Sequence, residues 1–91
     1  MAEAKAQKAR KALVSIVSSY DPKTVRKTAV ENSTEFRDFL AKSLESDGLD
    51  SLDVMDIMTE LEEALEINIP DTHFRTWQDA FDKILLLLNE E

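Results

Sequence analysis

The stretch that decides the fold is GLDSLDVMDIMTELEEALEINIPD, residues 48–71 of a chain of 91 residues. It carries two rows of side chains at helical spacing. The apolar row is Val54, Met55, Ile57, Met58, Leu61 and Leu65, and the acidic row is Asp53, Asp56, Glu60 and Glu63. Because residues three and four apart share one face of a helix, this pattern predicts an amphipathic helix over 51–66. The helix ends before Pro70, since proline disfavours helical backbone in the residue that precedes it.

Three further helices are predicted around this one, over residues 3–20, about 32–45 and 77–88. Their apolar faces are Ala9, Ala12, Leu13, Ile16, Val17 and Tyr20 in the first, Phe36, Phe39, Leu40 and Leu44 in the second, and Trp77, Ala80, Phe81, Ile84, Leu85 and Leu88 in the third. We therefore expect an all-α fold, a small helical bundle in which residues 1–91 form a single domain.

Polar residues mark where these helices begin and end. They are Asp21-Pro22 after the first helix, Asn32 with Glu35 before the second, Gly48 after the second, and Thr76 with Asp79 before the last. A side-chain oxygen three residues before an acid is typical of a helix N-cap. We expect a loop over 21–32 with a turn of helix near 24–27, and Gly48 is free to adopt positive φ where the second helix ends.

The composition excludes several classes of protein. One glycine and two prolines are too few turn residues for an all-β chain. The absence of cysteine excludes disulfides, thiolate metal sites and cysteine catalysis. His73 is the single histidine and no G-x-S-x-G motif is present, so no catalytic triad can be assembled and we expect no enzyme activity. The acids near Gly48 do not fit a calcium-binding loop, and we expect no metal.

Charge is divided unevenly along the chain. Residues 1–30 hold seven Lys or Arg against two acids, whereas residues 31–91 hold four against seventeen. The acidic part disfavours nucleic acid as a partner and favours a protein with a basic patch. No run of about 18 apolar residues is present, as a membrane span would need. We expect a soluble, cytoplasmic monomer without stable membrane insertion.

The same stretch resembles the acyl carrier protein family. The matching parts are the G-x-D-S-L motif at 48–52, the acidic helix that follows and the I-x-I-P-D exit at 67–71. The capped last helix also fits, so the resemblance covers roughly residues 48–88, with a looser match in the first helix. It implies that Ser51 receives 4′-phosphopantetheine from coenzyme A. The terminal thiol of that arm would hold acyl groups as thioesters, for fatty acid, polyketide or related biosynthesis.

The resemblance also implies roles for other residues. Asp50 and Asp53 would help to present Ser51 to a phosphopantetheinyl transferase. Basic patches on acyl ligases, synthases or acyltransferases would recognise Asp56, Glu60, Glu62 and Glu63. An acyl pocket would be lined by Met55, Met58, Leu61, Ile69, Phe74 and Trp77. A serine hydroxyl forms a stable phosphodiester, and a helix N-terminus favours the phosphate.

Departures from the family pattern indicate a specialised carrier. Residues 22–48 exceed the family's first loop by an extra helix in segment 31–46, and 71–75 is about two residues short. Asp47 stands where leucine is usual.

Other interpretations stay open. The pair Phe74 and Trp77 after the exit also resembles the D-alanyl carrier relatives. One alternative is therefore a carrier of aminoacyl groups, of the peptidyl or D-alanyl type. An unmodified helical adaptor is another. Ser51 alone could be an ordinary N-cap, and the acidic row a solvated face.

Overall fold

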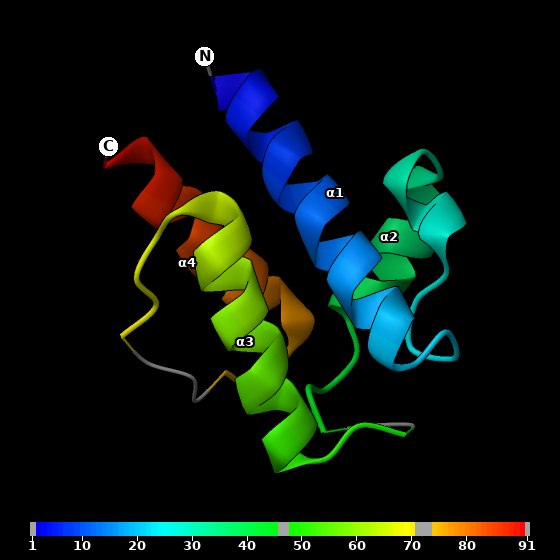
Figure 1. The fold of residues 1–91 in the computed structure, drawn as a ribbon. Coiled ribbons are helices and arrows are strands. Elements are labelled where there is room, and N and C mark those ends of the chain that lie inside the picture. The colour runs from blue at the N-terminus through cyan, green and yellow to red at the C-terminus, as the bar shows by residue number, and fades with distance from the viewer. Residues whose placement is uncertain (1, 46–47, 71–73, 91) are drawn as a thin grey trace.

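The computed structural model describes residues 2–45, 48–70 and 74–90. Within these residues lie four α-helices and a short 3-10 helix (Figure 1). Their bounds are α1 Ala2–Tyr20, η1 Lys27–Val30, α2 Ser33–Leu40, α3 Ser51–Leu65 and α4 Trp77–Asn89. The fold is all-α, as predicted, and α2 is the helix expected in segment 31–46. No described helix has both the length and the apolar character that crossing a membrane requires.

The long helix α1 organises the bundle. It packs against both α3 and α4, while α2 packs against α4 and η1. The start of α1 and the end of α4 lie at the same end of the molecule (Figure 1), where Lys5 Nζ donates a hydrogen bond of 2.7 Å to the carbonyl of Leu88. The start of α3, which bears Ser51, lies at the opposite end.

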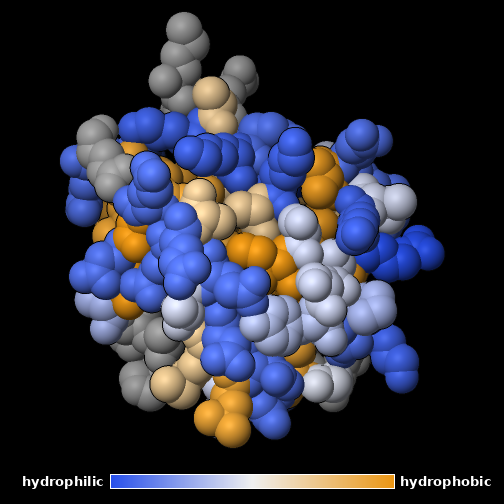
Figure 2. All heavy atoms as spheres, in the orientation of Figure 1, coloured by the Kyte–Doolittle hydropathy of each residue, from blue (hydrophilic) through white to orange (hydrophobic). Residues whose placement is uncertain are grey.

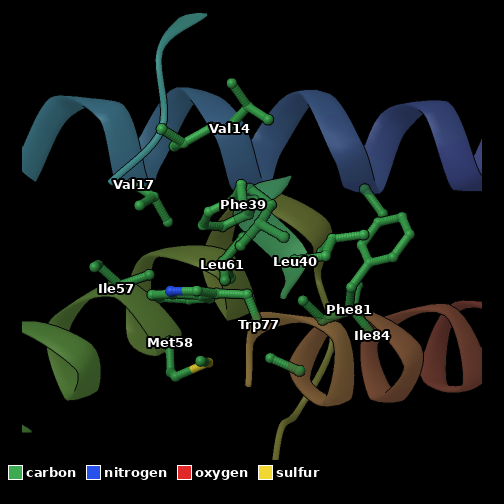
Figure 3. Packing of buried hydrophobic residues seen from close by; sticks show 14 of the residues in the cluster. Val14, Val17, Phe39, Leu40, Ile57, Met58, Leu61, Trp77, Phe81 and Ile84 are labelled. Carbon is green, nitrogen blue, oxygen red and sulfur yellow. The ribbon is translucent and has the colours of Figure 1, made fainter. Parts of the chain in front are cut away.

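Aromatic side chains join α2 to the core. The rings of Phe39 and Trp77 stack with centroids 5.2 Å apart, and Phe36 meets Phe81 edge to face at 5.1 Å. Figure 3 shows Trp77 beside Ile57 and Leu61 of α3. Trp77 is fully buried, so α2 shares one hydrophobic core with α1, α3 and α4.

Two expected helix boundaries were wrong. The second helix ends at Leu40 instead of near residue 45, because the chain beyond it turns to pair with the segment before α4. There Ser43 forms an isolated β-bridge with Thr76, and the backbone N–H of Trp77 donates to the Lys42 carbonyl at 3.0 Å. The helical turn of the first loop is η1, three residues later than expected.

Two apolar side chains assigned to helix faces are exposed. Met55 is 55% exposed because Val54, Met58 and Leu61 fill the core-facing side of α3. Tyr20, at the end of α1, is 38% exposed and donates its hydroxyl to the Glu60 carboxylate. The sequence reading also missed Val14, which is fully buried.

Truncating a core side chain tests these faces. Leu61→Ala should lower the free energy of unfolding by about 2–5 kcal/mol, because Leu61 is fully buried and its removal leaves a cavity. Leu86→Ala on α4 is the matched control, since Leu86 is 53% exposed and its loss should cost about 0.5 kcal/mol or less. Urea unfolding measures both. Equal effects would mean that the assigned core face of α3 is wrong.

Candidate functional site

The N-terminus of α3 is closed by a reciprocal pair of carboxylates. Asp50 is the N-cap, and its side chain accepts the Asp53 N–H at 2.9 Å. Asp53 in turn accepts the Asp50 N–H at 3.3 Å, which completes a capping box. Ser51 is the first residue of the helix and is exposed. The interpretation of Ser51 as an ordinary N-cap is therefore wrong, and its hydroxyl is available for another purpose.

The turn before this helix is held by a distant carboxylate. The Gly48 N–H donates to Asp21 Oδ2 at 2.8 Å, which ties the end of α1 to the turn that precedes Ser51. Gly48 does not adopt the positive φ that a glycine could take here. Its lack of a side chain matters for another reason: a Cβ there would lie 2.9 Å from Asp21 Oδ2. Close approach, rather than backbone conformation, requires glycine at this position.

Asp21 has further hydrogen bonds that fix its carboxylate. It accepts the Lys23 N–H at 3.0 Å and the Thr24 hydroxyl at 3.1 Å, and its residue is buried. These contacts, with that from Gly48 the strongest, lower the pKa of Asp21 below its usual range. The group therefore stays ionised at neutral pH and keeps accepting all three hydrogen bonds. The sequence showed only a helix-ending Asp-Pro pair here, and no local pattern pointed to Gly48.

A cavity of about 390 Å³ opens beside Ser51. It is lined by Ser43, Leu44, Glu45, Ser51, Val54, Met55, Phe74 and Arg75. The wall formed by 43–45 is positioned by Lys42, whose Nζ donates to the Lys23 and Thr24 carbonyls at 3.2 and 3.0 Å. The turn at 21–24 thus positions both the Gly48 turn and one wall of the cavity.

The six residues predicted to line an acyl pocket divide into two groups. Met55 and Phe74 line the cavity beside Ser51. Met58, Leu61, Ile69 and Trp77 are buried in the core and do not line this cavity. The structure therefore brings only two of the six together next to the serine, and the role of the other four stays a prediction.

Most of the acids predicted for partner docking also have structural contacts. Beyond the capping pair, Glu62 accepts the Ile69 N–H at 2.7 Å and so holds the exit from α3. Glu60 accepts the Tyr20 hydroxyl, and this hydrogen bond, with burial and the nearby acids, raises the pKa of Tyr20 to about 12. Asp56 and Glu63 are exposed on the same helix. The partner-docking role of the six acids stays a prediction.

Other sequence expectations fall partly outside the described residues. His73, Asp47 and Asp71 are among those that the structure does not describe. Within the described ranges, no group of three or more histidine, aspartate or glutamate side chains is arranged to hold a metal ion.

Comparison with known proteins identifies one family. Residues 30–79, which contain α2, α3 and the start of α4, match the family model described as a phosphopantetheine attachment site. Neither the comparison with curated proteins nor that with solved structures gave a match.

Adding one methyl group to the glycine tests the Asp21 contact. Gly48→Ala should lower the free energy of unfolding by about 1–3 kcal/mol at neutral pH, because the Cβ displaces the Asp21 carboxylate and strains a packed site. In an Asp21→Ala background the same substitution should cost much less, since the obstructing oxygen is gone. Urea unfolding of the four proteins in this cycle gives the coupling. Additive effects would show that Gly48 and Asp21 do not depend on one another.

Proposed function

This chain belongs to the family of phosphopantetheine attachment-site domains, and we propose that it is an acyl carrier in which Ser51 bears the arm. Its cofactor is 4′-phosphopantetheine, and its role is that of a carrier. The observation that supports Ser51 is its position: an exposed hydroxyl on the first residue of α3, beside a cavity, within the matched residues. When attached, the arm supplies a terminal thiol that holds the cargo as a thioester.

The residues around Ser51 suit a hydroxyl that another enzyme modifies. In the modification, the Ser51 oxygen bonds to phosphorus, a diphosphate bond of coenzyme A breaks, and the nucleotide half leaves with the electron pair. The serine proton passes to the transferase. No described side chain near Ser51 has to act as a base, because the carrier contributes only an accessible nucleophile. The capping box keeps the first turn of α3 formed while the hydroxyl reacts.

Partner enzymes would dock on the exposed side of α3. Leu52 and Met55, 69% and 55% exposed, lie one turn apart next to Ser51. In Figure 2 a hydrophobic group stands over this end of α3 among hydrophilic neighbours. An apolar centre with a charged rim is the usual composition of a protein interface. The helical spacing predicted Met55 to be in the core, and no role was predicted for Leu52.

The cargo that we propose is an acyl group, for fatty acid, polyketide or related lipid biosynthesis in the cytoplasm. The support is Asp50 directly before the serine and the acids along α3, which favour the acyl type over the peptidyl or D-alanyl type. Offering the arm-loaded protein to acyl and aminoacyl ligases in parallel distinguishes these cargos. We further propose that the carrier works as a monomer with a transferase and with acyl ligases, synthases or acyltransferases.

Removing the hydroxyl tests the attachment residue. Ser51→Ala should abolish uptake of the arm from coenzyme A with a broad-specificity transferase, read by intact mass. Its stability should change by about 0.5 kcal/mol or less, because Asp50 and not Ser51 caps the helix. Ser43→Ala is the matched control, since Ser43 lines the same cavity and should leave uptake intact. Uptake by Ser51→Ala, or none by the wild type, would reject the proposal and favour an unmodified adaptor.

Reversing two exposed charges tests docking. The double variant Asp56→Lys and Glu63→Lys should slow modification about tenfold at low salt, because opposite charges accelerate encounter. Added salt should slow the wild type and narrow this gap, since exposed charges are screened within about 8–10 Å. Glu31→Lys with Asp38→Lys makes the same charge change at exposed positions outside α3. If the two double variants behave alike, only net charge matters and α3 is not the docking face.

A further inference from the structure

Arg75 is a basic residue at the attachment site whose guanidinium has no assigned purpose. It lines the same cavity as Ser51 and is exposed just before Thr76, the N-cap of α4. Among the described residues, Arg26 forms an ion pair with Glu35, and Arg75 forms no hydrogen bond or ion pair with any of them. Its five N–H donors are therefore open to a ligand.

The surroundings of Ser51 create a need for a cation. Asp50 and Asp53 flank the serine, and Glu45 lines the cavity. A phosphodiester on Ser51 would add a further negative charge beside these carboxylates. The helix N-terminus offsets part of the repulsion, but its charge is equivalent to only about +0.5. A basic side chain in the lining of the same cavity would offset much of the rest.

Arg75 is the basic residue in the right place. Segment 31–91 has three others, Arg37, Lys42 and Lys83. None of these lines the cavity beside Ser51, and the ammonium group of Lys42 already donates to the Lys23 and Thr24 carbonyls. A guanidinium also suits the task, because its planar fork matches two oxygens of a phosphate.

We propose that Arg75 binds the phosphodiester that joins the arm to Ser51. This proposal rests on the proposed function. The contact would hold the first part of the arm against the cavity wall, where Leu44, Val54 and Phe74 provide apolar surface. Arg75 is thus a positioning residue that restricts where the arm lies between encounters with partner enzymes.

The test compares arm-free and arm-loaded forms of wild type, Arg75→Gln and the control Lys83→Gln. The ³¹P resonance of the loaded protein should shift in Arg75→Gln and stay in place in Lys83→Gln. Loading should also change the unfolding equilibrium constant in urea. For each protein we divide the unfolding constant of the arm-free form by that of the arm-loaded form. This ratio should be about three- to fivefold larger in wild type than in Arg75→Gln, because the contact between Arg75 and the phosphodiester stabilises only the loaded wild type, by the amount expected of a partly exposed ion pair.

The outcomes separate this proposal from the one on which it rests. Wild type that takes no arm overturns the proposed function, and the role of Arg75 with it. If wild type and Arg75→Gln both take the arm and show the same ³¹P resonance and the same ratio of unfolding constants, the role of Arg75 is overturned and the proposed function stands. Each variant is compared with its own arm-free form, so a change in its basal stability does not obscure the result. Arg75→Lys, which keeps the charge without the fork, should give intermediate values.

Discussion

The Asp21 carboxylate links two parts of the chain that lie 27 residues apart, and the geometry around Ser51 depends on this link. Its oxygens accept hydrogen bonds from Gly48, Lys23 and Thr24, so one side chain closes the end of α1 and fixes the turn before α3. Lys42 extends the arrangement by binding the carbonyls of the same 21–24 turn. A buried carboxylate is favourable here because several donors compensate the loss of water.

The acids of α3 divide into those that accept structural hydrogen bonds and those that face solvent. Asp50 and Asp53 cap its start and Glu62 holds its exit, whereas Asp56 and Glu63 face solvent. Repulsion along a row of like charges is reduced when some members accept hydrogen bonds. The helix therefore combines an ordered start with a smaller number of carboxylates that accept no structural hydrogen bond from the described residues. If partner enzymes dock on α3 as proposed, such a surface would favour rapid and reversible association.

Local sequence patterns predicted the helices, whereas features that depend on contacts between distant residues could not be predicted from them. Helical spacing and caps were sufficient for α1, α3 and α4, because both signals lie within each helix. The early end of α2 depends on pairing with Thr76, far along the chain. The need for glycine at position 48 likewise depends on Asp21. The position of Arg75 beside the cavity depends on how α4 packs. Met55 lies at the edge of the apolar row, where periodicity cannot separate a buried from an exposed side.

The position of the two helix ends has a practical consequence for how the molecule can be tethered. Lys5 of α1 is hydrogen-bonded to the Leu88 carbonyl of α4. The start of α3, which bears Ser51, lies at the end of the bundle opposite this contact (Figure 1). A linker, a neighbouring domain or a solid support joined to either end of the chain would therefore leave the serine pointing outward. The bundle acts as a short spacer, and immobilising it by either end should keep the exposed Ser51 side chain away from the support.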